Sequence, residues 1–242
     1  MYDIGPIDAA GAFTGDFGIH PDAPAAEIPG EIERDREIMV QRPGMRQKHV
    51  PIHFEPGTGR LFAGGRYLFD RYEDAEAYRR WVTEEFVVDG VPFPERGYFV
   101  EPRFLAWRVA GAWDFTPLQT HGGIRLQRWT LPAVVGEERL RRVWSSIRRS
   151  AARAGLASAW LLFSDERREA ALVTITALGA PAEVAGAGDR AITAALEGIA
   201  LEKTFDRVDL VWTLWMPRAA AGQPPSLWPN SPPLPAPAAV LV

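Results

Sequence analysis

Four histidines carry most of the candidate acid–base and ligand chemistry of this 242-residue sequence, because it contains no cysteine. They are His20, His49, His53 and His121. Imidazole titrates near neutral pH, so it can serve as a general base, and in its neutral form it binds metals. The absence of cysteine excludes disulfides, thiolate nucleophiles, iron–sulfur clusters and thiolate-ligated haem within this chain.

Two of these histidines, His49 and His53, lie four residues apart in the segment MRQKHVPIHFE, whose pattern predicts a β-strand. Side chains four apart on a strand point to one face, but their Cα atoms are roughly 13 Å apart at about 3.3 Å per residue. They therefore cannot easily chelate one metal ion, and Pro51 argues against a helix that would bring them together. If this face walls a pocket, either histidine is a candidate catalytic base. The alternative is that both are ordinary structural or exposed histidines.

Sequence motifs for other common reaction types are missing. No G-x-S-x-G nucleophile motif, Walker loop or dinucleotide-binding G-x-G-x-x-G lies in the required strand–helix context. Most aspartates and glutamates fall on expected helix surfaces or turns. Asp114, which follows Trp113, is the acidic residue that we single out as a further candidate.

The overall composition is that of an ordinary globular protein. Hydrophobic residues make up 47% and charged residues 24% of the chain, and the formal net charge is −4. A net acidic chain is not expected to bind nucleic acid. No segment approaches the roughly 20 apolar residues that span a bilayer, and the N-terminus lacks a signal-peptide pattern. We therefore expect a soluble, cytoplasmic protein without nucleic-acid or membrane partners.

The second half of the sequence predicts the order strand–helix–strand–strand–helix–strand. The expected elements are a strand at 124–131, a helix at 136–155, two strands within 158–178, a helix at 189–205 and a closing strand at 207–217. Asp189 is the expected N-cap of the second helix.

The first half follows the same order from its first helix onward. We expect an irregular arm at 1–26 with one short strand near Gly11–Phe17, a helix at 27–41, strands at 45–55 and 61–69, a helix at 73–86 and a strand at 102–115. This order is typical of the ferredoxin-like βαββαβ unit.

We therefore predict an α+β protein made of two tandem ferredoxin-like βαββαβ halves, which form an α/β-barrel-like pseudo-dimer. The halves span 1–118, including the N-terminal arm, and 119–217, and a Pro-rich extended tail spans 218–242. The two sheets are expected to wall an apolar pocket. Nine tryptophans supply large rigid surfaces for that pocket, for the core, or for both.

The segment 41–82 resembles the YdhR-type mono-oxygenases of the dimeric α/β-barrel superfamily. The resemblance is carried by Pro43-Gly44, by the AGG-x-YLF stretch at 63–69, and by Ala75 and Ala77-Tyr78 on the next expected helix. That superfamily includes cofactor-independent quinone-forming oxygenases, polyketide cyclases and haem proteins such as chlorite dismutases. The tandem length and the tryptophan content are also similar to haem-dependent alkene oxygenases of the trans-anethole oxygenase type, which cleave the side-chain double bond of propenylbenzenes.

Two adjacent glycines in this stretch, Gly64 and Gly65, have a physical meaning of their own. Glycines within a strand mark a bulge or a place where another group approaches the backbone closely. The pair either lets the sheet bend toward a barrel or makes room for a bound ligand.

The haem-dependent relatives in this resemblance draw attention to His121, at the joint between the halves. Gly122 and Gly123 leave space beside it, and a neutral histidine can be the axial ligand of haem b. Arginines on neighbouring strands, Arg108, Arg125 and Arg128, are candidates to bind the haem propionates as bidentate donors. A tyrosine is another candidate ligand to the iron. The alternative is that His121 is an ordinary linker histidine.

The resemblance implies an oxygenase that uses dioxygen on a small hydrophobic aromatic substrate, with haem held by His121 and oxidation or cleavage of an alkenylbenzene side chain. A second hypothesis is a cofactor-independent mono-oxygenase or polyketide-type cyclase, in which His49, His53 or Tyr67 takes a proton from the substrate. A third is a protein that binds a small ligand without chemistry. In each case we expect a homo-oligomer.

Overall fold

The structure is a computed structural model, and it describes residues 4–23, 35, 38–39, 42–55, 57–116, 121–177 and 182–215. For His121, 182–189 and 212–215 it describes the backbone alone. The tail at 218–242 and the expected boundary at 118 lie outside the described residues, as does most of the helix predicted at 27–41. Within that helix, Asp35, Ile38 and Met39 are described and are helical.

Each half of the chain contributes four antiparallel strands in the same spatial order. The first half has β2 (Gly11–Ile19), β3 (Met45–Phe54), β4 (Leu61–Phe69) and β7 (Phe99–Asp114), in the order β7-β2-β4-β3. The second half has β8 (His121–Thr130), β9 (Ser158–Ser164), β10 (Glu169–Ala177) and β11 (Glu202–Trp215), in the order β11-β8-β10-β9. Within each half, the fourth strand pairs with the first, the first with the third, and the third with the second. The predicted tandem ferredoxin-like arrangement is therefore confirmed.

The two sheets close on each other into an eight-stranded antiparallel barrel. β3 pairs with β11 on one side, and β7 pairs with β9 on the other. The short β1 (Gly5–Pro6) adds to β7 outside the closed circuit. Closure leaves the eight barrel strands without a free edge, which is the usual way in which an antiparallel sheet avoids unpaired backbone groups.

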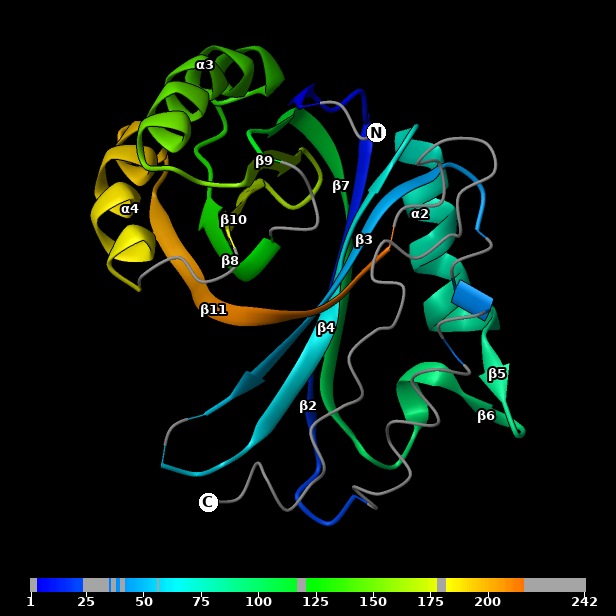
Figure 1. Cartoon of the computed structure of the whole chain (residues 1–242). Coiled ribbons are helices and arrows are strands. Elements are labelled where there is room, and N and C mark those ends of the chain that lie inside the picture. Colours follow the sequence, from blue (N-terminus) through cyan, green and yellow to red (C-terminus); the bar gives the residue numbers. More distant parts are fainter. Residues whose placement is uncertain are drawn as a thin grey trace.

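Helices cover the outside of the barrel on two sides (Figure 1). α2 (Tyr72–Arg80) continues into the π-helical turn η1 (Trp81–Glu85) and lies on the first half. α3 (Glu137–Arg153) and α4 (Ala182–Glu197) lie on the second half. The remaining elements are a small hairpin, β5 (Val87–Val88) and β6 (Val91–Pro92), and the 3₁₀ turn η2 (Phe93–Glu95). Among the described residues, no helix combines the length and the apolar character needed to cross a bilayer.

The short strand expected near Gly11–Phe17 is confirmed as β2, which extends to Ile19 and lies between β4 and β7. Two expectations in the second half are wrong in detail. α4 ends at Glu197 and 202–205 already belong to β11, so the helix predicted at 189–205 is placed too late. Asp189 consequently lies inside α4 and is not its N-cap.

The barrel interior is filled by side chains rather than hollow. Alternation along each strand sends one set of residues inward, as Ala12, Thr14 and Asp16 do on β2. Trp107 and Trp160 are both fully buried in this interior cluster, and the Trp107 indole donates a hydrogen bond to Thr14 (2.9 Å). The cavity that the structure shows lies on the outer face of the first-half sheet and not between the two sheets.

One end of the interior holds an ion network that links the two halves. Asp16 on β2 pairs with Arg66 on β4 (2.6 Å), with Arg207 on β11 (2.8 Å) and with Arg128 on β8. Arg207 also pairs with Asp209 (2.7 Å). Burial alone would raise the pKa of Asp16, but the three guanidinium groups outweigh burial and hold this pKa below its usual value.

The interior also holds the carboxyl group of Asp114, whose described hydrogen-bond donor is a neutral amide. The Gln47 side chain donates to Asp114 (2.8 Å), and nearby the Ser158 hydroxyl donates to the Trp113 carbonyl oxygen (3.1 Å). Trp160 in turn donates to Ser158 (3.0 Å). Burial raises the pKa of Asp114 to about 7, and these neutral donors offset only part of that rise.

We expect Asp114 to make the protein less stable as the pH rises from about 4 to 7. In that interval the unfolded chain has released the Asp114 proton while the folded chain retains it, so unfolding is favoured by up to about 4 kcal/mol. Asp114→Asn should remove this dependence, so that wild type loses more stability than the variant between pH 5 and pH 8. Urea unfolding of both proteins at the two pH values measures the difference, and parallel pH profiles would contradict the expectation.

The two outer faces differ in how they are filled. Under α3 and α4 a continuous apolar cluster packs the sheet, with Trp129, Leu140 and Ile147 buried in it. The Trp144 ring of α3 lies against Gly111 of β7, where even a Cβ atom would clash at 2.3 Å. Under α2 the cluster is mainly aromatic, and here the packing leaves a cavity.

Candidate functional site

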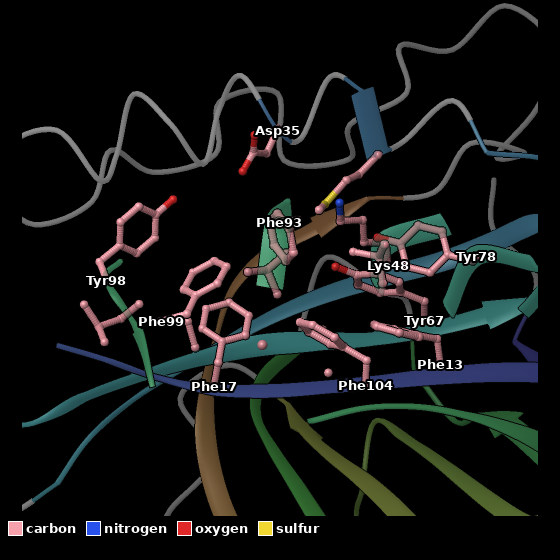
Figure 2. A pocket seen from close by; sticks show the side chains of 18 residues that line it. Phe13, Phe17, Asp35, Lys48, Tyr67, Tyr78, Phe93, Tyr98, Phe99 and Phe104 are labelled. Carbon is pink, nitrogen blue, oxygen red and sulfur yellow. The ribbon is translucent and has the colours of Figure 1, made fainter. Parts of the chain in front are cut away.

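The cavity lies on the outer face of the first-half sheet, between that sheet and α2 with η1 and η2 (Figure 2). Its volume is about 80 Å³. That is the order of size of an engineered cavity of ~150 Å³ that takes up benzene, and it is below the roughly 300–1,000 Å³ of pockets for larger ligands. In its present shape the cavity therefore suits a small molecule with a single ring.

The floor of the cavity is a platform of aromatic rings on β2, β4 and β7. The rings of Tyr67 and Phe104 lie within 24° and 20° of the plane of Phe13, at centroid distances of 5.3 and 6.0 Å. These residues point outward because they alternate with the inward-facing set of each strand. Figure 2 shows the three rings side by side along the strands.

A pair of glycines lets these rings lie low on the sheet. Gly15 on β2 is directly opposite Gly65 on β4. A Cβ atom at Gly65 would come within 2.5 Å of the Tyr67 ring, and one at Gly15 within 3.0 Å of Phe13 and 3.1 Å of Phe104. Gly64 points to the opposite face of the sheet, and there the absence of a side chain allows close approach of the β2 backbone, because a Cβ atom would lie 2.1 Å from the Gly15 carbonyl oxygen. The two adjacent glycines thus mark a close approach, and the β2–β4 register runs through them without a bulge.

The roof of the cavity comes from the helical layer and the loop after it. Tyr78 lies on α2, Val82 on η1 and Phe93 on η2, and each is buried. Met39 adds a flexible thioether side chain. The switch of α2 into a π-helical turn at Trp81 occurs directly beside the cavity, and such turns are frequent at functional sites.

Polar side chains meet at one end of this apolar cavity. Lys48 on β3 is opposite Tyr67 in the β3–β4 register, and its ammonium nitrogen lies 5.0 Å from the centre of the Tyr67 ring. Lys48 is 2% exposed. The rings of Tyr67 and Tyr78 pack edge to face there, at a centroid distance of 5.4 Å. Among the described residues that line the cavity, Lys48 is the only cation.

The two tyrosines are suited to donate hydrogen bonds rather than to accept a proton. Burial raises the pKa of Tyr67 above its ordinary value, and it does the same to the pKa of Tyr78. Both hydroxyls therefore stay protonated at neutral pH. Next to Lys48 they form an end of the cavity that favours a ligand oxygen carrying negative charge.

A buried ion pair includes Asp35, one of the residues that line the cavity. Asp35 lines the cavity and forms a two-point ion pair with Arg96, one contact of which measures 3.0 Å. Arg96 also donates to the hydroxyl of Tyr98 (2.9 Å). The side chains of Asp35 and Arg96 are 8% and 6% exposed. The pair therefore fastens the helical segment that carries Asp35 and Met39 to the loop between η2 and β7.

We expect Arg96→Met to lower the free energy of unfolding by about 3 kcal/mol, because it leaves the Asp35 carboxylate buried without its charge partner. The double variant Asp35→Leu/Arg96→Met should recover most of this loss, since it removes both charges. Urea unfolding of the two single variants and the double variant gives the coupling free energy. A double variant as unstable as the sum of the singles would show that the pair does not fasten the segment.

The two histidines predicted as bases do not line the cavity. His49 is fully buried on the inward face, where its ring lies 5.3 Å from that of Trp160. Nδ1 of His53 lies 3.0 Å from the carbonyl oxygen of Val208 and 3.9 Å from Asp209. Strand alternation explains the difference, because the outward positions on this part of β3 belong to Lys48 and Val50. Neither histidine can act as the base of a reaction in this cavity.

The residues predicted to hold haem are dispersed. Arg108 lies over the ring of Tyr72 (4.3 Å), Arg125 forms a two-point ion pair with Asp206, and Arg128 points into the ion network of the interior. They lie beside α2, on the outer face of the second half, and inside the barrel, so they do not form one propionate-binding site. The His121 backbone pairs with Ala177, and its side chain is outside the described part. Within that part, no three His, Asp or Glu side chains gather as a metal site requires.

A haem does not fit the described residues in the way that the sequence suggested. The arginines diverge, the space under α3 and α4 is packed by apolar side chains, and the cavity on the first half is too small for a macrocycle. We therefore derive no reaction step through haem, and the role of His121 stays a prediction.

No known protein family and no curated protein matches this sequence. Similar solved structures do exist. A "putative monooxygenase" from Lactobacillus acidophilus NCFM has a TM-score of 0.55 at 10% identity, covering 86% of this chain and 96% of its own. An "anthrone oxidase-like protein" has a TM-score of 0.54 at 11% identity, covering 86% and 94%. Chlorite dismutase from Candidatus Nitrospira defluvii, in complex with imidazole, has a TM-score of 0.52 at 8% identity, covering 84% and 92%.

These similarities show the fold. The chain has the α+β barrel fold that monooxygenase-like proteins and chlorite dismutases share, over most of its length. At 8–11% identity they carry no residue roles over to this chain.

Most residues of the cavity carry no recognisable signal in the sequence. Of the cavity's polar groups only Tyr67 was named as a candidate base, while Lys48, Tyr78 and Asp35 were not. The walls are phenylalanine and tyrosine, and no tryptophan lines the cavity among the described residues. A usable signal was present in β2, where Phe13, Gly15 and Phe17 alternate with Ala12, Thr14 and Asp16.

Proposed function

We propose that this protein is an oxygenase of small hydroxyarenes, which binds the substrate in the aromatic cavity and needs no cofactor for the reaction. The observation that carries the proposal is the combination of a flat, dry ring platform with Lys48, Tyr67 and Tyr78 at one end. A phenol or enol fits this arrangement with its ring on the platform and its oxygen toward Lys48. The fold that the chain shares with monooxygenase-like proteins agrees with this reaction class.

The chemistry begins with charge on the substrate oxygen. A buried ammonium group stabilises a phenolate or enolate far more than water does, because the apolar surroundings screen the attraction poorly. The protonated hydroxyls of Tyr67 and Tyr78 are available to donate to the same oxygen. The resulting anion is electron-rich at the ring carbons, and an electron-rich anion can give electrons to dioxygen directly.

The overall reaction balances without an external reductant. A ring-conjugated CH₂ group becomes a C=O group, one atom of dioxygen enters the product, and the other leaves as water. The substrate supplies all four electrons. The protein contributes orientation, exclusion of water by the aromatic walls, and stabilisation of the anion.

The test is oxygen consumption by the purified chain with a panel of single-ring hydroxyarenes that carry an activated CH₂ group, together with its absorption spectrum. We expect substrate-dependent oxygen uptake by a protein whose spectrum is that of the polypeptide alone, with one water formed per oxygen consumed. A Soret band that is required for activity would overturn the cofactor-independent proposal. It would favour the haem-dependent cleavage of an alkenylbenzene that the sequence resemblance implied.

A further inference from the structure

We infer that the facing glycines Gly15 and Gly65 determine which substrates enter, by setting the thickness of the cavity so that it accepts flat rings and rejects puckered ones. The inference deepens the proposed function and rests on its placement of the ligand in this cavity. It concerns shape alone and does not involve the polar end.

The two glycines set the height of the aromatic floor. Both glycines occupy outward positions, directly opposite each other on adjacent strands, where any other residue would project a Cβ atom into the aromatic layer. Tyr67 folds back over Gly65, and Phe13 and Phe104 flank Gly15. The three aromatic rings therefore pack against the strand backbone at Gly15 and Gly65 instead of projecting away from the sheet.

The roof of the cavity is held in place by its own contacts. Tyr78 packs edge-on against Phe13 at a centroid distance of 4.9 Å, and Val82 is 1% exposed. Asp35 is fastened by its ion pair to Arg96. Floor and roof touch where Tyr78 meets Phe13 and Tyr67, so the cavity is the narrow apolar space left around these contacts, and its aromatic walls match a planar ring better than a puckered one.

The two glycine positions predict effects of different size. At Gly65 an alanine methyl group would sit 2.5 Å from the Tyr67 ring, so the ring must lift into the cavity. At Gly15 the contacts of 3.0 and 3.1 Å require Phe13 and Phe104 to move by only a few tenths of an ångström. Gly65→Ala should therefore thin the cavity strongly, and Gly15→Ala weakly.

The probes are toluene and methylcyclohexane, which have the same number of carbon atoms and no oxygen. Methylcyclohexane has more C–H surface and leaves water more readily, so hydrophobicity alone favours it. We expect the wild-type chain to bind toluene about tenfold more tightly, against that trend. Gly65→Ala should weaken toluene binding about tenfold and Gly15→Ala about threefold, as overpacking of a dense site requires. Calorimetric titration of each protein measures these affinities.

A substitution in the roof enlarges the cavity, whereas the glycine variants reduce it. Its result is informative even if the glycine variants do not fold. Val82→Ala enlarges the gap, so it should raise the affinity for methylcyclohexane about tenfold and reduce the preference for toluene. Equal binding of both probes by wild type, or an unchanged preference in Val82→Ala, would overturn the inference. If the shape preference holds but no hydroxyarene is oxidised, the proposed function alone fails. If wild type binds neither probe, both fail.

Discussion

Asp16→Ala is expected to be the most damaging single substitution in this protein, lowering the free energy of unfolding by about 5 kcal/mol or preventing folding altogether. Asp16 is the shared partner of Arg66, Arg128 and Arg207. Removing its carboxylate leaves three guanidinium groups crowded inside the barrel, where Asp209 is the one other carboxylate paired with them among the described residues. The cost is large because a buried charge cannot regain the hydration it had in the unfolded chain.

Asp206→Ala is the matched control for this prediction. Asp206 on β11 is likewise an arginine-paired aspartate, because Arg125 of β8 donates to both of its carboxylate oxygens, but its side chain is 27% exposed. Water can replace the lost partner there, so a loss of about 1 kcal/mol is expected. Urea unfolding at pH 7 compares the two variants. Equal losses would show that the interior network does not hold the two halves together.

The order of elements was predictable because hydrophobic periodicity depends on local sequence. The amphipathic pattern of α3, the alternating run of β8 and the continuous apolar run of β9 each determine an element on their own. β2 was underestimated because its three glycines lower its strand signal. Gly11 faces the backbone of Arg71, and Gly15 faces the ring of Phe104 as well as that of Phe13, and such contacts with other segments cannot be read from the sequence of one strand. Residues 202–205 belong to β11 and not to the predicted helix, because the start of this strand depends on its pairing with β8.

The site was harder to predict because it depends on which face of each strand is inside. In β3 both faces are buried, so periodicity alone does not tell whether His49 or Lys48 faces the barrel interior. If the strand is shifted by one residue, His49 takes the outward position of Lys48, and the predicted site then contains a histidine where the structure has a lysine. The predicted propionate ligands are dispersed for a related reason. Arg125 and Arg128 lie three residues apart on one strand and therefore point to opposite faces.

Lys48→Met is expected to lower the rate of hydroxyarene oxidation about 100-fold, which is the usual effect of removing one donor that stabilises a developing oxyanion. Methionine has a similar length and no charge, and it suits a buried apolar site, so the variant should remain folded. Loss of activity would then report lost stabilisation of the substrate anion. Lys203, the other lysine of the chain, is 37% exposed and lies on β11, so Lys203→Met should leave activity unchanged.

A spectroscopic measurement separates this role from a purely structural one. 4-Nitrophenol absorbs visible light only as the phenolate, and the wild-type protein should bind it in that form at a pH below the pKa of the free phenol. Lys48→Met should bind the neutral phenol, and Lys48→Arg should restore part of the phenolate absorption because it restores the charge. Phenolate binding that persists in Lys48→Met would remove the lysine from the reaction and leave the tyrosine pair as the only described donors at that end of the cavity.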